Sequence, residues 1–124
     1  MFTLVRAVKD QFYPATQQWE HVMRTLLVGY DLNDPNQDYA KLGNFLKELS
    51  QKHKPRVDEG EKTWWHELDS TWLIRADLSA GELQAKLGDQ VADNDEVLVI
   101  DITGRSAAWQ GFKTEASEWL TKHL

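Results

Sequence analysis

Apolar and polar positions along the chain alternate between short runs typical of strands and longer stretches with helical spacing. Residues 25–31 form an apolar run that ends in a carboxylate, which predicts a buried strand. Apolar side chains then recur at steps of three and four from Tyr39 to Leu49, the spacing of an amphipathic helix. Pro35 suits the first turn of this helix and Pro55 ends it.

Two further strands and a second helix follow. Residues 63–68 and 71–76 are rich in β-branched and aromatic residues and lie close together in the chain, so they predict a hairpin. Ser79 and Glu82 have the spacing of a capping box. This box begins a helix that we expect to run from about Ala80 to Val91.

The order of these elements predicts the fold class. Residues 96–103 form the clearest remaining strand and residues 113–124 have helical spacing. Strand, helix, strand, strand, helix, strand is the ferredoxin-like βαββαβ arrangement, an α+β sandwich with an antiparallel sheet and both crossover helices on one face. An N-terminal segment and a C-terminal helix flank this predicted core.

Two adjacent tryptophans lie in the first strand of the hairpin. Because side chains alternate along a strand, Trp64 and Trp65 must point to opposite faces of the sheet. One of them therefore lies on the face without the crossover helices. That tryptophan either contacts another subunit or is covered by a terminal segment of its own chain, and the sequence leaves both alternatives open.

Composition and charge limit the classes of function. The chain has 124 residues, enough for one domain with a core, and no cysteine, which excludes disulfides, thiolate zinc sites and a cysteine nucleophile. The absence of cysteine also fits the cytosol, so we expect a cytoplasmic protein. No apolar run approaches the roughly 20 residues that span a bilayer, so we expect no membrane partner. The net charge of −6 weakens the case for a nucleic-acid partner. The local basic cluster, residues 52–56, follows a predicted helix, where cations favour the helix dipole.

The predicted topology brings acidic residues of three segments to one edge of the sheet. The first strand lies between the third and the fourth and is antiparallel to both, so its end lies beside their starts. Asp31 ends the first strand, Asp69 and Ser70 precede the third, and Asp95 and Glu96 open the fourth. Several carboxylates can bind Mg²⁺ or Mn²⁺, with Asp31, Asp69 and Asp95 as candidate ligands. Strand ends and turns are commonly acidic merely because they are solvated and capped, so turn chemistry is the alternative interpretation.

Three segments of the chain resemble a known family. They are residues 27–32, residues 68–74 and residues 96–100. From Met23 onward the chain resembles the small ferredoxin-like CRISPR-associated family of the spacer-acquisition complex (Cas-two), and is more similar still to its shorter stand-alone, SinR-like relatives. The resemblance covers about four fifths of the chain, which divides it into an extension, residues 1–22, and a ferredoxin-like domain, residues 23–124.

The resemblance implies a homodimer in which the two copies of Asp31 approach each other across the two-fold axis. It also implies that Asp31 binds Mg²⁺ or Mn²⁺ in an endonuclease acting on RNA or DNA, and that Ser70 matches the serine beginning the family's third strand, a second candidate catalytic residue. Apart from His66, residues 65–69 are acidic or apolar where the family often has basic and glutamine residues. The alternative is therefore a non-enzymatic dimeric adaptor or regulator that binds a protein partner.

Overall fold

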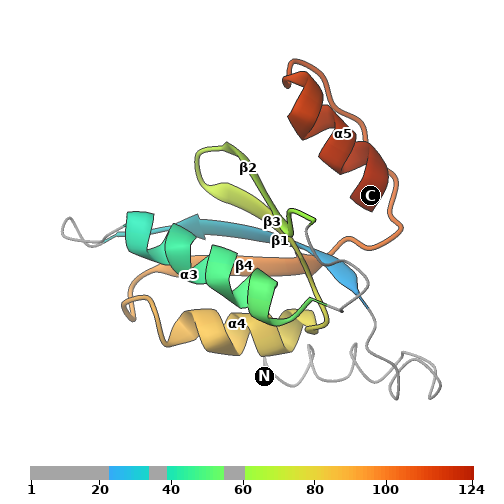
Figure 1. Cartoon of the computed structure of the whole chain (residues 1–124). Helices are drawn as coiled ribbons and strands as arrows, with labels where there is room; N and C mark the ends of the chain where they lie inside the picture. Colours follow the sequence, from blue (N-terminus) through green and yellow to red (C-terminus); the bar gives the residue numbers. More distant parts are fainter. Residues whose placement is uncertain (1–22, 34–38, 55–60) are drawn as a thin grey trace.

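The structure of the chain, a computed structural model, describes residues 23–33, 39–54 and 61–124. The predicted extension over residues 1–22, and Pro35 and Pro55 at the ends of the first helix, lie outside the described residues. The elements, labelled in Figure 1, are β1 (Arg24–Asp31), α3 (Tyr39–Lys52), β2 (Trp64–Leu68), β3 (Thr71–Ala76), α4 (Ala80–Gly88), β4 (Glu96–Asp101) and α5 (Thr114–His123).

The four strands form one antiparallel sheet in the order β2-β3-β1-β4. The α+β class predicted from the sequence is therefore confirmed, and β1 lies between β3 and β4 as the ferredoxin-like arrangement requires. Figure 1 shows α3 and α4 on one face of the sheet and α5 on the other. The two edge strands are β2 and β4.

The main core lies between the sheet and the two helices α3 and α4. Strand alternation directs Leu26, Val28 and Tyr30 of β1 toward these helices, where they are buried. Trp72 and Ile74 of β3 lie on the same side. The helices contribute five leucines, at positions 42, 46, 49, 83 and 87, whose spacing is the apolar periodicity read from the sequence.

A second, smaller core lies under α5 on the opposite face. Trp65 is 4% exposed there, its indole Nε1 donates to the carbonyl of Ala116 at 3.2 Å, and its ring meets Phe112 edge-on. Trp119 of α5 packs in the same cluster. The adjacent tryptophans do lie on opposite faces, because Trp64 packs against the main core. The far-face tryptophan is thus covered by the C-terminal helix of its own chain.

Two elements are shorter than their sequence pattern predicts. The helix α4 ends at Gly88 and does not reach Val91, since glycine is a poor helix former and residues 89–95 form the turns that lead to β4. The strand β4 ends at Asp101, two residues before the predicted end at Thr103. The Asp101 carboxylate accepts hydrogen bonds from both the backbone N–H and the hydroxyl of Thr103, which bends the chain out of the strand.

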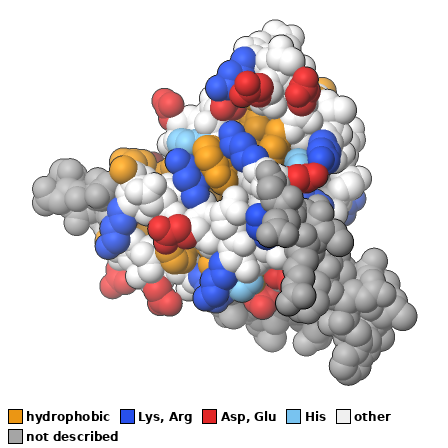
Figure 2. All heavy atoms as spheres, viewed as in Figure 1, with side chains coloured by type: hydrophobic (Ala, Val, Ile, Leu, Met, Phe, Trp, Pro, Cys, Tyr) orange, Lys and Arg blue, Asp and Glu red, His pale blue; other side chains and the backbone are white. Residues whose placement is uncertain are grey.

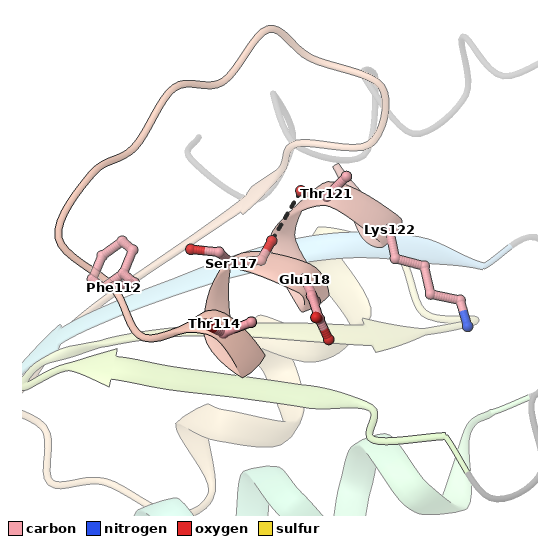
Figure 3. A pocket seen from close by; sticks show the side chains of 6 residues that line it. All are labelled: Phe112, Thr114, Ser117, Glu118, Thr121 and Lys122. Carbon is pink, nitrogen blue, oxygen red and sulfur yellow. Dashed lines mark hydrogen bonds between the residues drawn. The ribbon is translucent and has the colours of Figure 1, made fainter.

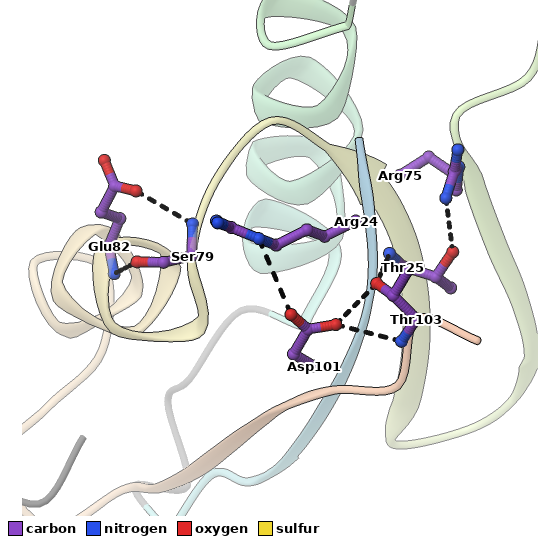
Figure 4. Close-up of polar contacts among 7 residues, drawn as sticks. All are labelled: Arg24, Thr25, Arg75, Ser79, Glu82, Asp101 and Thr103. Carbon is purple, nitrogen blue, oxygen red and sulfur yellow. Dashed lines mark hydrogen bonds and ion pairs between the residues drawn. The ribbon is translucent and has the colours of Figure 1, made fainter. Parts of the chain in front are cut away.

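A polar network ties the sheet together at this end (Figure 4). The Thr103 hydroxyl accepts from the backbone N–H of Thr25, and Asp101 pairs with Arg24 at 3.7 Å. The Thr25 hydroxyl accepts from the Arg75 guanidinium at 2.9 Å and donates to the carbonyl of His123 at 2.7 Å. The network therefore joins β1, β3, β4 and the end of α5. In the described part of the chain, no helix has the length and apolar character needed to cross a membrane.

Candidate functional site

The structure places the acidic residues of the three segments at one end of the sheet. Asp31 lies opposite Glu96 in the β1–β4 register, and the N–H of Tyr30 donates to the carbonyl of Ser70 at 3.2 Å. The β2–β3 turn with Asp69 and Ser70 is therefore next to the end of β1. The juxtaposition expected from the topology is present at the level of the backbone.

Asp95 supports the backbone at this edge. One carboxylate oxygen accepts from the N–H of Asn33 at 2.8 Å and the other accepts from the N–H of Ala92 at 2.7 Å. The Asn33 amide in turn donates to the carbonyl of Asn94 at 2.6 Å. Both oxygens of this candidate metal ligand thus join the segment after β1 to the turn before β4. This is the turn chemistry that the sequence left open as an alternative.

The remaining acidic side chains divide between the two sides of the sheet. Asp31 and Glu96 line a hollow of about 460 Å³ on the side opposite α3 and α4. Asp69 lines a different hollow, together with Tyr30 and residues of α3. Among the described residues there is no group of three or more His, Cys, Asp or Glu side chains that could hold a metal ion. The candidate ligands share an edge of the sheet but not one site.

Beside Asp31 lies a part of the sheet that α5 leaves uncovered, which we name the open sheet face. It consists of Gly29, Leu98 and Ile100, with Asp31 and Glu96 at its end. Leu98 is 51% exposed and Ile100 is 44% exposed, and Leu98 lies opposite Gly29 in the register. A Cβ added to Gly29 would meet nothing within 4 Å, so the space above the centre of this face is open.

The second hollow, of about 290 Å³, is a mixed aromatic and polar pocket between α3 and the sheet. We name it the aromatic pocket; it is lined by Tyr30, Tyr39, Ala40, Gly43, Asn44, Lys47, His66, Asp69 and Trp72. On the face viewed in Figure 2, hydrophobic side chains lie directly beside lysine or arginine and histidine side chains.

The wall of the aromatic pocket that belongs to the sheet is held rigidly. The Trp72 indole Nε1 donates to the Tyr30 hydroxyl at 3.0 Å, and the His66 ring stacks on Trp72 with 4.0 Å between centroids and 13° between planes. The His66 Nε2 lies 3.0 Å from the carbonyl of Asp69. A carbonyl only accepts, so this nitrogen carries the proton and the other ring nitrogen is the acceptor in the neutral ring.

Burial raises the pKa of Tyr30 above its ordinary value, with smaller contributions from Tyr39 and Asp69, although the Trp72 hydrogen bond lowers it. The Tyr30 hydroxyl therefore stays protonated.

The pocket also has one positive and one negative side chain. Lys47 Nζ lies 4.5 Å from the centroid of the Trp64 ring and 5.9 Å from that of Trp72. Within the described residues, Lys47 forms no ion pair and the Asp69 carboxylate accepts no hydrogen bond. Among the described residues, neither charged group is therefore neutralised by a partner of opposite charge.

The sequence interpretation named Asp69 but missed this pocket. The usable signal was the row Tyr39, Gly43 and Lys47, spaced four residues apart on one face of a predicted helix. Gly43 permits the close approach of α3 to the sheet, since a Cβ there would lie 2.9 Å from Cζ2 of Trp72. The sequence does not show that Trp72 lies beside this row, and only the fold identifies the row as one wall of a pocket.

A third hollow runs along the outer side of α5 (Figure 3), lined by Phe112, Thr114, Ser117, Glu118, Thr121 and Lys122. The Thr121 hydroxyl donates to the carbonyl of Ser117 at 3.0 Å, a bond internal to the helix. Because all the lining residues lie on one helix and the turn before it, this hollow brings no separate segments together.

Comparison of the chain with models of protein families finds no match. Searches of the curated proteins and of the solved structures also find no match.

Proposed function

We propose that the chain forms a homodimer through the open sheet face and acts as a Cas-two-like, non-enzymatic binding module. The observation that carries this proposal is the exposure of Leu98 and Ile100, at 51% and 44%, on one side of an edge strand. Exposed apolar side chains that lie together favour association, whereas single ones are common on any protein surface.

A second copy of the chain fits the open sheet face better than an unrelated helix. A two-fold contact pairs the same patch on both subunits, so a flat apolar face with an open centre at Gly29 is complementary to itself. The same contact brings Asp31 and Glu96 of one copy near those of the other. Like charges repel at short distance, so a divalent cation strengthens the dimer by neutralising them.

Sedimentation velocity of the full chain tests the dimer. We expect a dimer in the wild type and a monomer for Leu98→Glu, because the introduced charge would be buried in the contact. Tyr39→Glu is the matched control, since Tyr39 is 47% exposed on α3, across the sheet from Leu98. A monomeric wild type at micromolar concentrations, with and without Mg²⁺, would overturn the proposal.

One observation favours a second candidate, a divalent-metal-dependent endonuclease acting on RNA or DNA. The Asp31 carboxylate is exposed, makes no hydrogen bond or ion pair with any described residue and lies in register with Glu96. Two carboxylates are a common protein contribution to a Mg²⁺ site that keeps several waters. Such an ion orients water against a phosphodiester and stabilises the developing charge. In this candidate Ser70, exposed in the neighbouring turn, contacts the substrate.

Cleavage of labelled single- and double-stranded RNA and DNA with Mg²⁺ or Mn²⁺ tests the endonuclease. The variant Asp31→Asn should abolish cleavage, whereas the control Asp93→Asn, in an exposed turn, should retain it. No cleavage by the wild type across metals and pH values would leave the binding module as the function. Equal cleavage by wild type and Asp31→Asn would exclude Asp31 as the centre of the reaction.

A further inference from the structure

We propose that the aromatic pocket binds a guanine base, read by Asp69 and Lys47 and stacked on its aromatic wall. This site lies on the side of the sheet opposite the open sheet face, so it does not depend on the proposed dimer. The base has two sources, a free nucleotide or an unpaired guanine in a single strand, and they share the same recognition chemistry.

Size and shape match a single base. The hollow of about 290 Å³ is slightly smaller than the range of about 300–1,000 Å³ for small-molecule pockets. It is therefore too small for a dinucleotide cofactor. Its walls are aromatic: Tyr30 and Tyr39 lie 5.9 Å apart between centroids, and His66 lies flat against Trp72. Unpaired bases are typically held by stacking on such rings.

Stacking surfaces are still open on this wall. Tyr39 lines the pocket and is 47% exposed, so part of its side chain is accessible to a base. His66 is partly exposed, and its ring covers the indole of Trp72 and extends that stack outward. The hydrogen bond between Trp72 and Tyr30 fixes the indole beneath it, so the wall is organised before a ligand arrives.

The polar groups select guanine among the bases. A carboxylate offers two acceptor oxygens and no donor, and guanine presents two adjacent donors, N1–H and the N2 amine, on its Watson–Crick edge. Guanine O6 and N7 are acceptors that suit a lysine ammonium such as Lys47. On the same edge, adenine, cytosine and uracil each place an acceptor next to their donor. None of them therefore offers two adjacent donors to the Asp69 carboxylate.

The charge of the pocket also suits a base better than a phosphate group. Lys47 and Asp69 together contribute no net charge, and the chain as a whole carries −6. A neutral base gains from both side chains, whereas a phosphate would gain from Lys47 and be repelled by Asp69. The Tyr30 hydroxyl accepts from Trp72 and has its own hydrogen available for a ligand acceptor.

Isothermal titration calorimetry of the full chain with nucleosides tests the site. We expect guanosine to bind, inosine to bind at least tenfold more weakly because it lacks the N2 amine, and adenosine to give no measurable heat. Asp69→Asn and Lys47→Met should each lower the affinity for guanosine at least tenfold. Lys86→Met, which changes a lysine of α4 outside the pocket, should leave the affinity unchanged.

Three results would overturn the proposal. They are no heat with guanosine at millimolar concentration, equal binding of inosine and guanosine, or unchanged binding by Asp69→Asn. The inosine comparison uses the wild type alone and stays decisive if either variant fails to fold. Guanosine monophosphate and a short single-stranded RNA with one guanine separate the sources. If the RNA binds more tightly than guanosine monophosphate, the ligand is a single strand. If only guanosine and its monophosphate bind, the ligand is a free nucleotide.

Discussion

The substitution Gly43→Ala tests the close contact between α3 and the sheet. Gly43 is buried in the middle of α3, and a Cβ there would lie 2.9 Å from Cζ2 and 3.4 Å from Cη2 of the Trp72 indole. Trp72 has little freedom to move away, because it is 2% exposed, bonded to Tyr30 and stacked against His66. Either α3 or the indole must shift to admit the methyl group.

Two effects of opposite sign decide the change in stability. Alanine in a helix interior is favoured over glycine by about 1 kcal/mol. Inserting a methyl group into a well-packed contact costs about 1–3 kcal/mol. The packing cost exceeds the gain over most of this range, so we expect Gly43→Ala to lower the free energy of unfolding by about 1 kcal/mol. In a domain of this size that corresponds to about 4 °C in Tm.

Urea unfolding followed by circular dichroism measures the effect. Gly88→Ala is the matched control, since it also adds a methyl group to a helical glycine but meets only the Gln84 amide nitrogen, at 3.9 Å. We expect this control to be neutral or stabilising by up to about 1 kcal/mol. If Gly43→Ala were as stable as Gly88→Ala, the indole of Trp72 would be free to move and the contact would not be tight.

Three further changes test other contacts. Tyr30→Phe should destabilise the fold at pH 7 by about 1–3 kcal/mol, because the buried Trp72 indole N–H loses its acceptor. Since burial raises the Tyr30 pKa in the folded state, the phenol stabilises the fold below pH 10 and loses that contribution as the pH rises through the folded pKa. The gap between wild type and Tyr30→Phe should therefore narrow above pH 10 in urea titrations, and a constant gap would contradict the reasoning. Asp95→Ala should cost about 2 kcal/mol in urea, with no dependence on Mg²⁺, because two backbone N–H groups lose a charged acceptor; a loss below about 0.5 kcal/mol would show that water replaces the carboxylate. Ser79→Ala should cost about 1 kcal/mol in the same assay, since it removes half of a complete capping box at the start of α4, and an unchanged midpoint would show that the box adds nothing.

Some features of the fold follow from local patterns in the sequence. The apolar period marks α3 and the strands, and the spacing of Ser79 and Glu82 marks the start of α4, where both hydrogen bonds of the capping box form. The errors lie at the ends of elements. The Gly88 end of α4 and the Asp101 end of β4 depend on glycine propensity and on a side-chain bond to Thr103, which compete with the apolar pattern.

The candidate site was only partly accessible from the sequence. Topology alone predicts that the end of β1 meets the starts of β3 and β4, so the acidic residues were expected at one edge. It does not specify on which side of the sheet each carboxylate lies or which carboxylate is already bonded. The structure places Asp31 and Asp69 in different hollows and uses Asp95 to hold two backbone N–H groups.

The sequence by itself determined the α+β class and the alternation that directs Trp64 and Trp65 to opposite faces, because both depend on periods of a few residues along the chain. Only the tertiary structure decided that α5 covers Trp65 and leaves Leu98 exposed, and that Lys47 and Trp72 enclose a pocket. These features join residues far apart in the chain, and their contacts depend on how the layers of the fold pack together, which a local pattern does not encode.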